Sequence, residues 1–168
     1  MTPMQHNNGS ARKAILTAWL AAGSFDILSA FTHSIAYGGS AMGVLRAVAS
    51  GLIGKQAVGG GWAVASLGMF LHYAIMLVIV LVFWAASRRF SFLLKRPLLI
   101  GPLYGICVFA VMNVLVLPLS QIIFTPRYDW PTLLIGICIH MVAVGLPIAT
   151  VFHYYAHSAR AAGSATAA

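Results

Sequence analysis

The sequence predicts an all-α integral membrane protein: a four-transmembrane-helix bundle with a Gly-rich interfacial or re-entrant helix between helices 1 and 2. Two observations predict this fold class. Of the 168 residues, 61% are hydrophobic and only 7% are charged, whereas a soluble domain is about half apolar and a quarter charged. Four apolar runs also supply the roughly 20 residues that a helix needs to cross a hydrocarbon core of about 30 Å.

The four runs form a single membrane domain over residues 14–156. The expected spans are 14–36, 62–86, 98–121 and 132–156. Residues 1–13 and 157–168 are mostly polar or small, and we expect disordered tails there. The first span also resembles a signal peptide, but its apolar run continues to Ala36, beyond a usual h-region, so we expect it to remain as a span.

The connection at residues 37–61 is rich in glycine and too charged for a confident span. Between Ala41 and Ala57, helical spacing gathers small residues on one face and larger apolar residues on the other. A small-residue face allows close backbone approach to another helix. We therefore expect an interfacial or re-entrant helix at the outer mouth of the bundle, with a loosely ordered loop as the alternative.

Two patterns concern helices 3 and 4. Helix 3 opens with Gly101-Pro-Leu-Tyr-Gly105, a small-xxx-small spacing that favours a tight helix crossing. In helix 4, Pro147 frees the carbonyl group of Ala143 and should kink the helix there.

The formal net charge of +8 comes from basic residues that flank the spans. Seven are expected on one side: Arg12, Lys13, Arg88, Arg89, Lys95, Arg96 and Arg160. The other side has Arg46, Lys55 and Arg127. The positive-inside rule then places both termini in the cytoplasm. Because the cations follow the spans, the basic composition needs no nucleic-acid partner.

The two cysteines do not predict a disulfide or a metal motif. Counting along the helices, Cys107 and Cys138 differ in depth by roughly 8 Å, more than a disulfide tolerates. We expect both to be packing residues.

Each expected span carries one strongly polar side chain near the same depth. Asp26 is the only carboxylate in a span, and insertion scales give such a residue a cost of about 2.5–3.5 kcal/mol at mid-bilayer. At about 1.5 Å per residue, Asp26 and His72 lie roughly 15 Å from the outer boundary, and Asn113 and His140 roughly 12 Å. His33, nearer that boundary, would stand at the entrance. These residues predict an inward polar layer that is accessible from outside.

Three functions fit this layer. Intramembrane ionisable groups are functional candidates by default, so the first is binding of a proton or a small solute, with transport as one use. The second is a scaffold whose glycine-rich faces bind another copy or another membrane protein, the polar residues serving as interhelical hydrogen bonds. The third is a redox protein with haem or a metal between His72 and His140. Since no serine or cysteine has a recognisable catalytic context, the sequence favours a non-enzyme without a cofactor.

Five segments carry a resemblance to a known family: Ala49-Ser-Gly-Leu-Ile-Gly-Lys55, Leu71-His72, Gly101-Pro-Leu-Tyr-Gly105, Val111-Met-Asn-Val-Leu-Val-Leu-Pro-Leu-Ser120 and Gly145-Leu-Pro-Ile-Ala149. Together they resemble a family of small, functionally uncharacterised bacterial inner-membrane proteins. The resemblance implies a single four-helix domain, in the bacterial cytoplasmic membrane, and implies no activity.

Overall fold

The computed structural model describes residues 8–123 and 129–165, and in these ranges the regular elements are all helical. In chain order they are α1 (Asn8–Ala36), α2 (Ala41–Ile53), η2 (Gly54–Ala57), α3 (Trp62–Arg89), η3 (Ser91–Leu94), α4 (Pro97–Val111), η4 (Met112–Val116), α5 (Leu117–Leu119), α6 (Trp130–Ile139), η5 (His140–Gly145) and α7 (Leu146–Ala165). η2 and η3 are 3-10 turns, whereas η4 and η5 are π-helical segments inside longer helices.

Four helical runs are long and apolar enough to cross a membrane: Gly9–Ala36, Trp62–Arg89, Pro97–Leu119 and Trp130–Ser158. They match the four expected spans closely. The first and last helices extend further than expected, because residues 8–13 belong to α1 and residues 157–165 belong to α7. Alanine-rich sequence, as at 159–165, has a high helix propensity and accounts for the added turns.

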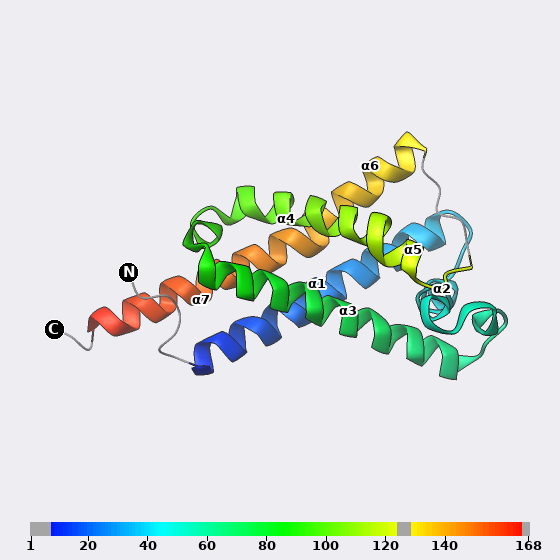
Figure 1. The fold of residues 1–168 in the computed structure, drawn as a ribbon, viewed down its shortest axis with the longest axis horizontal. Helices are drawn as coiled ribbons and strands as arrows, with labels where there is room; N and C mark the ends of the chain where they lie inside the picture. The colour runs from blue at the N-terminus through cyan, green and yellow to red at the C-terminus, as the bar shows by residue number, and fades with distance from the viewer. Residues whose placement is uncertain (1–7, 124–128, 166–168) are drawn as a thin grey trace.

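The four runs alternate in direction, so their ends gather into two groups (Figure 1). The beginning of α1, the turn η3 and the end of α7 lie together at the left of Figure 1, whereas α2, α5 and the beginning of α6 lie at the right. We call the first group the basic end, because it carries Arg12, Lys13, Arg88, Arg89, Lys95 and Arg96. The opposite group is the α2 end, with Arg46 and Lys55; Arg127 lies outside the described residues.

The main core lies where α1, α3, α4 and α7 meet. Its largest fully buried side chains include Phe83, Phe152 and Ile148. The ring of Phe83 packs at 4.9 Å from Tyr104 and 5.5 Å from Phe152, measured between centroids. A smaller cluster of Ile27, Leu45 and Ala65 joins α1, α2 and α3.

The Gly101/Gly105 face of α4 packs against the fourth span of the same chain. A Cβ atom at Gly101 would lie 2.8 Å from the Cα atom of Leu146, and one at Gly145 would collide with the carbonyl oxygen of Gly101. Tight helix crossings use small residues because a side chain would hold the backbones apart. The small-xxx-small pattern therefore serves a crossing within the chain.

The helix α2 in the glycine-rich connection packs on α1 and α3. Its N-cap is Ser40, whose hydroxyl oxygen accepts from the amide of Gly43 at 3.0 Å, and it ends at Gly54, which has a φ of 56° that suits glycine. Gly68 of α3 is in direct contact with the backbone of Leu45. In addition, the amide of Gln121 donates to the carbonyl oxygen of Gly51 at 2.9 Å. These contacts hold α2 over the end of the bundle.

Candidate functional site

A single cavity of about 770 Å³ at the α2 end is lined by Asp26, His33, His72, Asn113 and His140. The first two belong to α1, His72 to α3, Asn113 to η4 and His140 to η5. The structure thus places all five residues of the predicted layer around one hollow. Most of the other lining side chains are apolar, including Ile75, Met76 and Val144. A mostly apolar pocket with a few convergent polar groups is the usual form of a small-molecule site.

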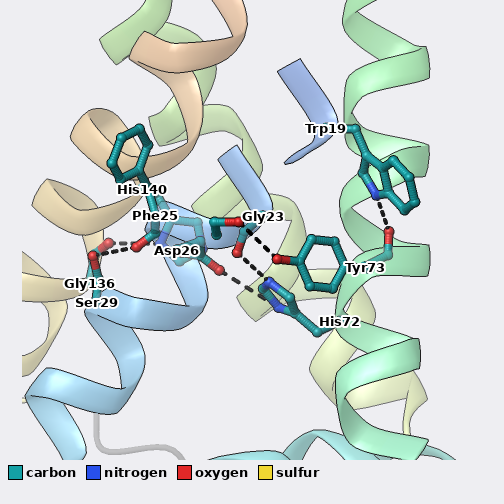
Figure 2. A network of polar contacts seen from close by, with 10 residues as sticks. Trp19, Gly23, Phe25, Asp26, Ser29, His72, Tyr73, Gly136 and His140 are labelled. Carbon is teal, nitrogen blue, oxygen red and sulfur yellow. Dashed lines mark hydrogen bonds and ion pairs between the residues drawn. The ribbon is translucent and has the colours of Figure 1, made fainter. Parts of the chain in front are cut away.

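Within this layer, Asp26 and His72 form a close pair. The His72 Nδ1 atom lies 4.0 Å from an Asp26 carboxylate oxygen, and the two side chains are 10% and 19% exposed. The second ring nitrogen, Nε2, is 2.9 Å from the carbonyl oxygen of Gly23 (Figure 2). Gly23 is itself buried against Tyr73, so α1 and α3 approach closely at this level.

The Gly23 contact determines the state of the His72 ring. A backbone carbonyl oxygen only accepts hydrogen bonds, so His72 Nε2 must carry a proton to bond it. A neutral ring would then present a bare lone pair from Nδ1 to the Asp26 carboxylate, which is also acceptor-only when ionised. A proton on either Nδ1 or Asp26 removes this conflict. The geometry is therefore suited to a pair that shares one proton.

His140 and Asn113 each use one polar atom on their own helix. The Nδ1 atom of His140 lies 2.9 Å from the carbonyl oxygen of Gly136, and the amide nitrogen of Asn113 donates to Phe109 at 2.9 Å. By the same rule, Nδ1 of a neutral His140 carries the proton and Nε2 is an acceptor. No other described residue bonds His140 Nε2 or the Asn113 amide oxygen, so both acceptors remain for a ligand.

Both of these residues lie in the π-helical segments. In η4 the amide of Leu117 bonds the carbonyl of Met112, and in η5 the amide of Leu146 bonds that of Met141. Each segment ends two residues before a proline, Pro118 or Pro147, which lacks an amide proton and clashes with the carbonyl four residues earlier. A wider turn relieves this clash. The kink expected at Pro147 thus takes the form of a π segment, and such segments are frequent at functional sites.

His33 lines the cavity from the last turn of α1, toward the α2 end. Its ring packs at 4.8 Å from Tyr37, and it does not contact the Asp26–His72 pair. Ala47, Val48 and Gly51 of α2 also line the cavity. α2 therefore forms part of the cavity wall on the side of His33, and the entrance expected at His33 stays a prediction.

Three residues beside the pair were missed by the sequence reasoning. The indole nitrogen of Trp19 donates to the carbonyl oxygen of Tyr73 at 2.7 Å (Figure 2). The Tyr73 hydroxyl group is 2.9 Å from that of Ser24. Tyr73 follows His72 directly, but nothing in the sequence shows which partners meet.

The charge around the pair is limited to a few groups. The Tyr73 ring packs at 5.3 Å from that of His72, and His140 and His33 line the same cavity from the fourth span and from α1. On α2, the guanidinium of Arg46 bonds the sulfur of Met42 at 3.0 Å and does not line the cavity. No lysine or arginine is among the described residues that form the cavity wall.

The haem and metal alternative meets one obstacle at His72. Its two ring nitrogens face Gly23 and Asp26, so ligation of iron would require one of these contacts to break. In the described ranges, no three His, Cys, Asp or Glu side chains gather as candidate metal ligands.

The expectation for the cysteines needs a correction. In place of packing inside the bundle, Cys107 and Cys138 are free and exposed. Depth counting gave their level but not the rotation of their helices.

The fold and the cavity define a class: a helical bundle with four helices that are long and apolar enough to cross a membrane. Comparison with protein-family models, curated proteins and solved structures finds no match for this chain. The resemblance to small inner-membrane proteins stays a prediction.

Proposed function

We propose that this chain is a multi-pass membrane protein that binds a proton and a small hydrogen-bond-donating solute in the cavity between its four spans. The carrying observation is that polar side chains from all four spans line one cavity. A carboxylate inside an apolar bundle is costly, and a proton held by Asp26 or by His72 Nδ1, 4.0 Å away, would offset that cost. The layer supplies a proton site in Asp26 and His72, and acceptors in Asn113 and His140.

The proposed placement is in the bacterial inner membrane, with the basic end in the cytoplasm. The cavity then opens toward the outside, beneath α2, which lies at the outer interface or re-enters the membrane there. Cations at the cytoplasmic end satisfy the positive-inside rule. Gly68 of α3 supports this position, since its lack of a side chain lets the short helix pack closely on α3.

The scaffold alternative loses one of its supports, because the Gly101/Gly105 face is occupied by the fourth span of the same chain. An oligomer or a membrane-protein partner would need a different surface. The lipid bilayer is the partner that the long apolar helices support directly.

The proton site is tested by nuclear magnetic resonance of isotope-labelled histidine in the purified protein, recorded across pH. We expect His72 Nε2 to stay protonated throughout, since the Gly23 carbonyl oxygen bonds it. We also expect the Asp26–His72 pair of the wild type to bind one proton as the pH falls. This proton uptake should be absent in Asp26→Asn. The asparagine keeps the size and hydrogen-bonding capacity of the side chain but cannot ionise.

Asp129→Asn is the matched control, because Asp129 is the other acidic residue of the chain. It caps α6, where its side chain accepts from the amide of Thr132, and it does not line the cavity. This variant should titrate His72 as the wild type does. A His72 signal in Asp26→Asn with the full wild-type pH response would overturn the proton site.

A further inference from the structure

A second hollow, the α3–α4 groove, lies beside the cavity. It has a volume of about 410 Å³ and contains Ile75, Val78, Ile79, Tyr104, Cys107 and Val111 among its lining residues. It shares Ile75, Ile79, Val108, Met112 and Val116 with the cavity wall. The two hollows are therefore adjacent, and the same apolar side chains of α3 and of the third span border both.

The groove faces outward from the bundle. Val78 is 60% exposed and Val111 is 51% exposed, and in a membrane these side chains would face hydrocarbon. Toward the basic end, the hydroxyl of Tyr104 closes the space by donating to the carbonyl oxygen of Ile79 at 2.6 Å. On α3 the groove is lined from Ile75, about one helical turn beyond His72, to Val82, and on the third span from Tyr104 to Val116, which lies past Asn113. A chain lying in it would run beside the polar layer toward the basic end.

The two hollows differ in the polarity of the side chains that line them. The groove is lined by apolar side chains apart from Tyr104 and Cys107, whereas the polar groups gather in the cavity. Bilayer hydrocarbon is as apolar as the groove, so a hydrocarbon chain gains little by moving into it. Any preference for one molecule must therefore come from a polar head in the cavity.

The hydrogen-bonding groups of the polar layer determine which head group can bind there. Asn113 and His140 each present a free acceptor, and the Asp26 carboxylate lies 4.0 Å from His72 Nδ1. A ligand must then donate hydrogen bonds. An anionic head is disfavoured beside Asp26, since no lysine or arginine is among the described residues lining either hollow.

We propose that the ligand is a single-chain amphiphile with a hydrogen-bond-donating, non-anionic head, such as a long-chain alcohol. Its head binds among Asp26, Asn113 and His140, and its hydrocarbon chain lies in the α3–α4 groove. This inference rests on the proposed function and names the solute class for the same cavity. In the proposed membrane orientation, the ligand has the head-outward direction of an outer-leaflet lipid.

The test is photolabelling in phosphatidylcholine nanodiscs with a long-chain alcohol that carries a photoreactive group in its chain. Labelled peptides are located by mass spectrometry. Two matched probes keep the same chain: the methyl ether, which lacks the donor, and the alkyl sulfate, which is anionic. We expect the alcohol to label residues 75–82 and 104–116, and unlabelled alcohol to compete about tenfold better than unlabelled ether, the difference that an unpaired buried polar group makes.

Two valine variants examine the groove itself. Val111→Phe fills it from its rim, whereas Val114→Phe adds the same side chain to a position that is 78% exposed and outside both hollows. Labelling by the alcohol should fall in Val111→Phe to the level of the ether probe and stay unchanged in Val114→Phe. Both variants should keep the His72 titration of the wild type, because neither residue touches the pair.

The two cysteines give an independent readout. Cys107 lines the groove and Cys138 does not, although both are exposed. The alcohol should slow alkylation of Cys107 by N-ethylmaleimide and leave Cys138 unaffected. Equal labelling by alcohol and ether that Val111→Phe does not change would mean surrounding lipid only, and would overturn the inference. A normal His72 titration in that case would leave the proton site standing.

Discussion

At the scale of single residues, His72 shows how a main-chain contact sets the chemistry of a side chain. The carbonyl of Gly23 requires a proton on Nε2, so the nitrogen facing Asp26 is the one with a variable state. His140 has the reverse arrangement, with Nδ1 on Gly136 and Nε2 left as an acceptor. Two histidines at similar depth therefore differ in which ring nitrogen bonds the main chain and which one faces the cavity. The sequence alone does not reveal this difference.

Asparagine substitution at two positions of α1 should separate the cavity from the lipid-facing surface. The free energy of unfolding of Asp26→Asn should lie within about 1 kcal/mol of the wild-type value, because the amide can still bond neighbouring groups. Leu28→Asn, at a site that is 56% exposed, should lose about 2 kcal/mol or more, because its amide would face hydrocarbon without partners. Membrane yield and thermal unfolding in detergent measure both. Equal losses would contradict the inward placement of Asp26.

At the scale of elements, the sequence predicted helices well and their local irregularities poorly. Hydropathy and the constant helical rise placed four helices and brought Asp26, His72, Asn113 and His140 to one level. By helical spacing, Phe31 falls on the side of helix 1 opposite Asp26, yet it is partly buried against the cluster of Ile27, Leu45 and Ala65. The packing of α2 against helix 1 buries Phe31, and helical spacing within one helix cannot predict such a contact.

The π segments could not be predicted, because a proline predicts a break in the hydrogen bonds but not how the turn before it rearranges. In η5, the bond from Leu146 to Met141 adds a residue to the turn and rotates the preceding residues about the helix axis. This rotation sets the direction of the His140 side chain. Likewise, the Trp19 bond to Tyr73 depends on how α1 and α3 pack.

Gly145→Ala should weaken the crossing between α4 and the fourth span. Alanine gains about 1 kcal/mol of helix propensity, but its Cβ would meet the Gly101 backbone, and overpacking costs up to about 3 kcal/mol where the backbone cannot yield. We expect a net loss of about 2 kcal/mol in thermal unfolding. Gly61→Ala, whose Cβ meets nothing within 4 Å, is the control. Unchanged stability in Gly145→Ala would mean that the crossing is loose.

At the scale of the whole molecule, the separation of charge between the two ends determines the proposed orientation. Six described cations lie at the basic end and two at the α2 end, so the count remains one-sided without Arg127 and Arg160. The described helices place these groups at opposite ends of the bundle (Figure 1). The proposed orientation follows from where the cations lie along the membrane normal. The sequence predicted which cations gather at each end of the bundle, and the orientation itself stays a prediction.

Reporter fusions check that orientation. Fusions after Arg89 and after Ala168 should be active only with a cytoplasmic reporter, and a fusion after Lys55 only with a periplasmic one, because translocating clustered cations is disfavoured. The Lys55 fusion serves as the internal control for reporter export. Periplasmic activity after Ala168 would reverse the proposed topology and place the cavity mouth in the cytoplasm.

The Asp26–His72 contact has a consequence for how the protein would respond to membrane voltage. A carboxylate and an imidazole that share one extra proton carry no net charge, whichever atom holds it. A full elementary charge moved across a membrane changes in energy by about 2.3 kcal/mol per 100 mV, whereas a neutral pair feels only the small effect on its dipole. Voltage would therefore act on this cavity when the proton leaves and Asp26 remains charged. Passage of an uncharged alcohol beside the protonated pair would be electrically silent.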